Sequence, residues 1–210
     1  SPGARLRLGA RQAQRQRAMR RRVGAGAGAV RAGPLESYEA ALAAAPLATK
    51  CATSGVLFGV SDCVAQRGEA AGGGLDGARV ARYVGFGAAV HAPLFSAFFA
   101  AQDALVDPWA GPAAPLVKLG VDQLLWTPFA FLPVFFGGMK LLEGRGGDEA
   151  LREVRERGWG LTPTLVSNWK LWVPANVVNY ALVPPELRVL WVNSVSLVWT
   201  VYLSRVQNDD

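Results

Sequence analysis

Charged residues are scarce in this chain. They make up 18% of its 210 residues, against about 25% in soluble domains. Hydrophobic residues reach 51% and the mean hydropathy is +0.19. The length fits one domain. The low charge therefore favours a membrane protein over a soluble globular one.

Acidic residues are absent from the first 35 residues, which hold nine Arg. The rest of the chain carries 13 Lys and Arg against all 16 Asp and Glu, so the basic charge belongs to an N-terminal arm. The arm resembles an organellar transit peptide. It is alternatively a solvated tail, or an arm bound to an anionic surface such as lipid heads, an acidic protein or RNA. We therefore divide the chain into an arm, 1–35, and a membrane domain, 36–210, in which no DNA-binding site is predicted.

Residues that carry catalysis or bind metals are also few. Cys51 and Cys63 lie twelve residues apart in one apolar segment, about 18 Å along a helix, which is too far for a disulfide. We expect both to be buried thiols. The single histidine, His91, lies in an apolar run, where a hydrogen bond to a neighbouring helix is its expected role. With no nucleophile elbow, phosphate loop or metal-ligand spacing, the sequence predicts no enzyme, no catalytic or metal-binding residue and no cofactor.

Tryptophan is abundant at the other end of the chain. Four of the seven Trp residues lie between Ser167 and Arg205, and an indole ring suits the bilayer interface because it is apolar but carries a polar N–H. We interpret this stretch as two embedded helices, 163–182 and 186–206, joined at Pro184-Pro185. The predicted interface anchors are Trp169, Trp172, Trp199 and Arg188.

Upstream of this stretch, the hydrophobic runs predict further embedded helices. One helix is expected at 47–66, preceded by a short helix that Ser37 caps. Its small residues would let another helix approach closely: Ser54, Gly55, Gly59 and Ser61. The charge-free run 83–102 is about 20 residues and thus long enough to span a bilayer. The run 123–139 contains prolines that an embedded helix tolerates.

The segment 144–160 is the one strongly charged helix that the sequence predicts. Its acids come first and its arginines last, as the helix dipole favours. It is expected to connect the spans along the membrane surface. With no strand pattern in view, we predict an all-α integral membrane bundle of four to five embedded helices plus this short charged surface helix.

Polar residues inside or at the ends of these apolar helices are the candidate functional set. An unpaired buried charge costs several kcal/mol, so these side chains must pair with one another or line water. One interpretation is interhelical ion pairs and amide hydrogen bonds that hold the bundle; the other is a polar path for small solutes. The candidates are Lys50, Asp62, Lys118, Asp122, Gln123, Lys170, Asn176 and Asn179.

Three groups of residues, covering most of 37–205, also form a recognisable pattern. They are Tyr38…Leu42…Pro46…Lys50…Gly55…Gly59…Ser61-Asp62…Gln66, then Lys118-x-x-x-Asp122-Gln123-x-x-x-x-Pro128, and finally Asn168-Trp169-Lys170-x-Trp172-x-Pro174-x-x-x-x-Asn179-Tyr180-x-x-Val183-Pro184-x-x-x-Arg188 with Trp199-x-x-Tyr202-Leu203-Ser204. This pattern resembles the peroxisomal membrane protein twenty-two / Mpv-seventeen family. The second span departs from it, because His91 precedes Pro93 and Phe98-Phe99 replaces an aromatic Trp-Tyr pair.

The resemblance implies a multi-span protein of an organelle membrane, in the lipid bilayer of either the mitochondrial inner membrane or the peroxisome. The Arg-rich arm favours the mitochondrion, and a plastid membrane stays open. Some members are weakly selective channels for small polar metabolites, which is the function the resemblance implies. The alternative is a non-transporting accessory subunit of a larger membrane complex, docked partly through the basic arm.

Overall fold

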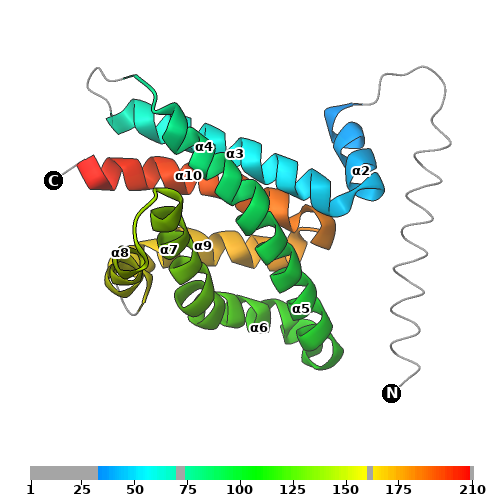
Figure 1. The fold of residues 1–210 in the computed structure, drawn as a ribbon. Coiled ribbons are helices and arrows are strands. Elements are labelled where there is room, and N and C mark those ends of the chain that lie inside the picture. Colours follow the sequence, from blue (N-terminus) through cyan, green and yellow to red (C-terminus); the bar gives the residue numbers. More distant parts are fainter. Residues whose placement is uncertain (1–32, 70–73, 160–162, 209–210) are drawn as a thin grey trace. The chain divides into compact units, whose positions relative to one another are not determined.

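The computed structural model describes residues 33–69, 74–159 and 163–208, and all regular structure in these ranges is helical (Figure 1). The predicted all-α fold is therefore confirmed, while most of the predicted basic arm, residues 1–32, lies outside the described residues. The chain divides into two compact units, residues 1–49 and 50–210. The elements in order are α2 (Pro34–Ala44), α3 (Pro46–Glu69), α4 (Gly77–Phe86), η1 (Gly87–His91), α5 (Ala92–Ala110), η2 (Gly111–Ala113), α6 (Ala114–Val121), η3 (Asp122–Phe131), α7 (Leu132–Leu142), α8 (Gly147–Glu153), η4 (Val154–Gly158), α9 (Pro163–Leu182), η5 (Pro185–Leu187) and α10 (Arg188–Asn208).

The first helix of the described chain, α2, begins at Pro34, with Gly33 as its N-cap. The amide of Gly33 donates to Glu36 Oε2 over 3.1 Å. Proline suits the first helical position, since its φ is already helical and it has no amide to satisfy. The predicted cap at Ser37 is wrong, because Ser37 lies inside the helix and its amide donates to the Gly33 carbonyl.

Close contact between α3 and the segment α4–η1 depends on small residues. A Cβ at Gly59 would lie 2.7 Å from Val84 Cγ2, and one at Gly55 would lie 3.2 Å from Ala88 Cβ. On the opposite side, a Cβ at Gly87 would lie 2.8 Å from the Ser54 carbonyl oxygen. The predicted role in close packing is confirmed for Ser54, Gly55 and Gly59, and for Ser61 it stays a prediction.

The helical segment from Gly77 to Leu142 is the one stretch of the described residues that is long and apolar enough to cross a membrane by length and composition. It is not straight, because Gly111 adopts φ 51° and ψ −127°, a conformation that favours glycine. The chain turns there, and α6 packs back against α5. The predicted number of four to five embedded helices stays a prediction.

The charged segment forms two short elements, α8 and η4, which pack against α7. Asp148 and Glu149 lie in the first turn of α8, and Arg152 lies in its last turn, as the charge pattern predicts. The chain continues through α9 and α10, and η5 lies between them (Figure 1). The predicted helix 163–182 coincides with α9, whereas η5 delays the start of α10 to Arg188. The helix predicted at 47–66 extends to Glu69, and the charged helix predicted at 144–160 begins only at Gly147.

Aromatic side chains fill the interior of the second unit. One cluster joins α5, α9 and α10 through Phe95, Phe98, Phe99, Tyr180, Val189 and Val192. The ring of Trp126 stacks on Phe98, with ring centroids 4.1 Å apart. A second cluster joins α3, α4 and α7, with Phe58, Phe86 and Met139 at its centre.

The second unit combines its apolar core with an exposed apolar surface and many buried polar side chains. Large apolar side chains are exposed along most helices, which a soluble monomer rarely shows over so wide an area. The buried polar set is long: Ser54, Ser61, Asp62, Gln66, His91, Gln102, Lys118, Asp122, Gln123, Thr127, Asn168, Asn176, Asn179, Arg188 and Asn193. Lipid-facing helices have this arrangement, since only the interior can satisfy polar groups.

The start of α4 gives a prediction on pH. Asp76 is its N-cap, and the Arg79 amide donates to Asp76 Oδ1 over 3.0 Å. This bond lowers the pKa of Asp76 below its usual value of 3.8, so its contribution to stability is complete above that value and is lost as pH falls below it. We expect hydrogen-exchange protection in the first turn of α4 to fall below about pH 4.

Asp76→Asn supplies the control, because asparagine also caps helices but does not titrate in this range. Its protection, corrected for intrinsic exchange, is expected to stay constant down to pH 2. The same loss of protection in this variant as in the parent would show that another group is responsible.

Candidate functional site

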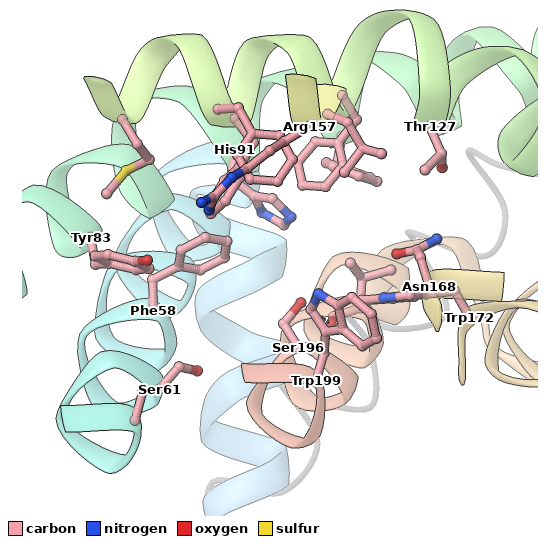
Figure 2. Close-up of a pocket in the computed structure, with 18 of the residues that line it drawn as sticks. Phe58, Ser61, Tyr83, His91, Thr127, Arg157, Asn168, Trp172, Ser196 and Trp199 are labelled. Carbon is pink, nitrogen blue, oxygen red and sulfur yellow. Dashed lines mark hydrogen bonds between the residues drawn. The ribbon is translucent and has the colours of Figure 1, made fainter. Parts of the chain in front are cut away.

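A cavity of about 400 Å³ lies inside the second unit, between the helices. Figure 2 shows side chains of α3, α4, η1, η3, η4, α9 and α10 around it, among them Phe58, Tyr83, Thr127, Asn168 and Trp199. Its volume is in the usual range of small-molecule sites. The mixture of aromatic and amide side chains offers both apolar walls and hydrogen-bonding groups to a small solute.

The inner end of the cavity is formed by Asp122, Gln123, Asn168 and Asn176, all of which are buried. Asn176 Nδ2 donates to Asp122 Oδ2 over 2.9 Å, and Tyr180 Oη donates to the same oxygen over 2.9 Å. Thr127 Oγ1 donates to Asp122 Oδ1 over 3.3 Å. The carboxylate of Asp122 is therefore held by neutral donors, and the structure shows no cation among its hydrogen-bond partners in the described residues.

The local fold of η3 explains how Asp122 is held. η3 is a π-helix from Asp122 to Phe131, and in a π-helix residues five apart stand over one another. Thr127 therefore lies above Asp122. Pro128 has no amide, so the Gln123 carbonyl lacks its i+5 partner. Trp169 Nε1 of α9 donates to that carbonyl over 3.3 Å and satisfies it.

The outer end of the cavity is charged. Lys140, Glu143, Glu153 and Arg157 line it, and Glu143 and Arg157 are exposed. Lys140 Nζ lies 2.9 Å from Glu143 Oε2, and Arg157 Nε lies 3.2 Å from Glu153 Oε1. The cavity therefore runs from an exposed mouth with paired charges to a buried floor at Asp122.

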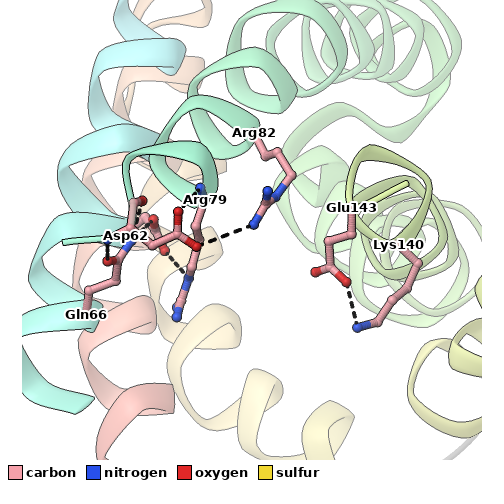
Figure 3. A network of polar contacts seen from close by, with 7 residues as sticks. Asp62, Gln66, Arg79, Arg82, Lys140 and Glu143 are labelled. Atoms are coloured by element: carbon pink, nitrogen blue, oxygen red, sulfur yellow. Dashed lines mark hydrogen bonds and ion pairs between the residues drawn. The ribbon is translucent and has the colours of Figure 1, made fainter. Parts of the chain in front are cut away.

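Beside this mouth, a polar network joins α3 to the start of α4. Arg79 Nε lies 2.7 Å from Asp62 Oδ1, and Gln66 Nε2 donates to Asp62 Oδ2 over 2.7 Å. The Asp76 amide donates to Gln66 Oε1 over 2.6 Å. Figure 3 shows this network together with the neighbouring pair of Lys140 and Glu143. The buried charge of Asp62 is thus compensated by an arginine that also lines the cavity.

A second charged cluster lies away from the cavity, between the second half of α5, the last turn of α6 and the start of α10. Asp103 Oδ1 lies 2.6 Å from Lys118 Nζ and 2.6 Å from Arg188 Nη1. Lys118 Nζ lies 2.6 Å from Asp107 Oδ1. The two cations are almost fully buried, whereas the Asp107 side chain is 44% exposed. We call Asp103, Asp107, Lys118 and Arg188 the ion cluster.

The structure brings together part of the predicted polar set. Three of its residues line the cavity, namely Asp122, Gln123 and Asn176. Asn179 is buried next to Asn176, Asp62 is in the network with Arg79, and Lys118 is in the ion cluster. Lys50 is half-buried and Lys170 is exposed, and neither lines the cavity. A role for these eight residues in a pore stays a proposal.

Of the predicted interface anchors, the three tryptophans are half-buried and Arg188 is buried, and their role at an interface stays a prediction. Trp172 and Trp199 line the cavity, Trp169 bonds to Gln123, and Arg188 is in the ion cluster. The predicted bond of His91 to another helix is confirmed, because Ser54 Oγ lies 3.4 Å from His91 Nδ1. Cys51 and Cys63 are free, as predicted, but both are partly exposed and not buried.

Three important residues escape the sequence analysis, namely Asp103, Tyr180 and Arg79. Asp103 looks like a helix terminator, Tyr180 like part of an apolar face, and Arg79 like a flanking cation. Their partners lie 15, 58 and 17 positions away, and no local spacing rule connects residues across such separations.

The apolar surface, the polar interior and the all-helical architecture define a helical membrane protein. The sequence pattern of the Mpv17 / PMP22 family matches residues 140–204. The chain is 38% identical over 156 residues to "Protein SYM1" of Mycosarcoma maydis, a match that covers 74% of this chain and 76% of that protein. The chain belongs to the Mpv17 / PMP22 family of membrane proteins.

Two further relatives extend this match. "Protein SYM1" of Saccharomyces cerevisiae is 32% identical over 177 residues, which are 81% of this chain and 88% of that protein. "Peroxisomal membrane protein 2" of Bos taurus is 32% identical over 189 residues, which are 87% of this chain and 94% of that protein. No solved structure matches the chain.

Proposed function

We propose that this chain is a permeation path for small polar solutes across an organelle membrane. The name of the bovine relative refers to the peroxisomal membrane, and the Arg-rich, acid-free N-terminal sequence favours the mitochondrial inner membrane within this setting. The lipid bilayer is the partner that its exposed apolar side chains require.

The observation that carries the proposal is the cavity of about 400 Å³ and the order of the residues along it. The exposed charges of the mouth lead past aromatic walls to a floor of buried amides and one carboxylate. A bundle that needed only internal hydrogen bonds for its stability would pack this volume with side chains, since protein interiors are close-packed. A cavity that reaches the surface and has polar groups at both ends supports entry of water and small solutes.

Electrostatics supports a role for Asp122 in selectivity. The charges at the mouth form pairs, so their fields largely cancel at a distance. Asp122 has only neutral donors around it. Inside a low-dielectric bundle, a single carboxylate acts strongly on a passing ion. We therefore expect Asp122 to favour cations and polar neutral solutes over anions.

The experiment is measurement of conductance and reversal potential in planar bilayers that contain the full chain. Asp122→Asn keeps the side-chain shape and removes the charge. We expect it to lower the cation-to-anion permeability ratio several-fold. Asp148→Asn is the control, since Asp148 is an exposed residue in the first turn of α8, outside the cavity, and its ratio should equal that of the parent.

If the Asp122→Asn protein folds and conducts like the parent, Asp122 does not act on permeating ions. Absence of conductance in the parent and both variants would instead favour the accessory-subunit alternative. In that case, deletion of residues 1–35 should release the chain from its complex, as native gel electrophoresis of membrane extracts would show. Unchanged migration after the deletion would contradict docking through the arm.

A further inference from the structure

On α10 and on the α6–η3 segment, the cavity ends one helical turn short of the ion cluster. On α9, Asn176 lines the cavity and Tyr180 lies one turn beyond it. On α10, Val192 lines the cavity and Arg188 lies one turn before it. On the α6–η3 segment, Asp122 is at the floor and Lys118 lies one turn before it. A turn is about 5.4 Å long, so the barrier between the cavity and the cluster is thin.

Tyr180 occupies this barrier. Its Oη donates to Asp122 Oδ2 over 2.9 Å, and the Arg188 guanidinium lies 5.7 Å from the centre of its ring. The Phe99 ring meets it edge to face, with centroids 6.1 Å apart. The phenol therefore contacts the floor of the cavity through its hydroxyl and a residue of the ion cluster through its ring.

Polar atoms without partners surround this barrier. Gln102 Oε1, Asn179 Oδ1 and Arg188 Nε are buried and have no hydrogen-bond partner among the described residues. Buried polar groups are usually paired, since an unmatched one costs about 1–3 kcal/mol. In an open path, water or a polar solute beside Tyr180 would satisfy these atoms.

The far side of the barrier also reaches the surface. Asp103 is 27% exposed and Asp107 is 44% exposed, and both bond to the buried Lys118. A charged solute that enters here can pair with Asp103, Asp107, Lys118 or Arg188. This pairing lowers the free-energy cost of removing the solute from water.

From this arrangement, and on the basis of the permeation function proposed above, we infer that the ion cluster is the second mouth of the path and that Tyr180 is its gate. In the structure the gate is closed by the hydrogen bond from Tyr180 to Asp122. Loss of that bond frees the ring to turn away from the floor, which joins the cavity to the cluster.

The test uses the reactivity of a cysteine placed in the barrier itself. Gln102→Cys serves as the reporter in a chain in which Cys51 and Cys63 are changed to serine, because Gln102 is buried and donates to the Lys118 carbonyl. Ser196→Cys, on the cavity wall, is the positive control. The probe is a small, positively charged methanethiosulfonate reagent applied to the purified full chain in detergent.

Tyr180→Phe removes the hydroxyl and keeps the ring. We expect it to raise the reaction rate at Gln102→Cys at least tenfold and to leave the rate at Ser196→Cys unchanged. Tyr38→Phe makes the same chemical change at a residue of α2 that does not line the cavity, and should alter neither rate. If the rate at Gln102→Cys is unchanged in folded Tyr180→Phe protein, Tyr180 is not the gate.

Conductance separates this inference from the proposed function. With both correct, Tyr180→Phe raises the mean conductance several-fold over the parent. A faster reaction at Gln102→Cys with no conductance in any variant would support Tyr180 as a gate and refute permeation. Conductance in the parent with an unreactive Gln102→Cys in both backgrounds would support permeation and refute the gate.

Discussion

Replacing Asp103 with alanine is expected to lower the free energy of unfolding by about 2–3 kcal/mol. Asp103 Oδ1 is the shared partner of Lys118 and Arg188, at 2.6 Å from each, and the two cations are 4% and 8% exposed. Breaking a buried pair costs about 3–5 kcal/mol, because the remaining charge stays buried without compensation. We take a lower value, since Asp103 is itself 27% exposed and Lys118 retains Asp107.

The measurement is reversible unfolding of the purified chain in detergent, followed by circular dichroism. Glu149→Ala is the matched control, because it breaks an exposed ion pair with Arg145. The Arg145 side chain is 58% exposed and the Glu149 side chain 36%, and Arg145 Nε lies 3.9 Å from Glu149 Oε1. Exposed pairs contribute little, with a median of about 0–1 kcal/mol. Equal losses in the two variants would show that the ion cluster does not stabilise the bundle more than a surface pair.

Replacing Gly87 with alanine is expected to destabilise the fold by about 2–3 kcal/mol. The new Cβ would lie 2.8 Å from the Ser54 carbonyl oxygen and 2.9 Å from Phe58 Cβ. The carbonyl belongs to the backbone of α3 and cannot rotate away, so the helices must separate. Overpacking of this kind costs about 1–3 kcal/mol, and separation also weakens the bond from Asn193 Nδ2 to Ser54 Oγ, at 2.7 Å.

Gly85, two residues earlier, provides the control, since no atom lies within 4 Å of a Cβ built there. Gly85→Ala should be neutral or stabilise by about 0.5–1 kcal/mol, because alanine loses less backbone entropy in a helix. Comparison of the two Gly→Ala changes separates the steric cost at Gly87 from the general effect of alanine on helix stability. A Gly87→Ala chain as stable as the parent would mean that α3 can move outward without loss.

The sequence was sufficient to predict the helices and the membrane character. The sparse charges, the proline positions and the acid-to-base order of 148–157 are local features, and local features determine where helices form and which segments avoid water. The same holds for Asp122, whose position in an apolar run predicted that it must be paired or lie next to water.

Other features depended on contacts between distant residues. Ser37 was mistaken for a cap because Gly33-Pro34 is the stronger start signal. The interface role expected of Trp169 followed from composition, while its bond to the Gln123 carbonyl depends on a proline 41 positions away in the chain. Lys118 and Asp122 lie one turn apart, but they bond to different groups.

By itself, the sequence determined that this protein is helical, that its helices suit a membrane and that its polar residues must find partners in the interior, because hydropathy and helix propensity act over a few residues. Only the tertiary structure decided which partners they find. Asp103 joins two cations from other helices, and Tyr180 lies between Asp122 and Arg188. Those choices depend on how the helices pack, which is set by the close approach at Gly87 and the turn at Gly111, and packing of this kind is a property of the whole bundle.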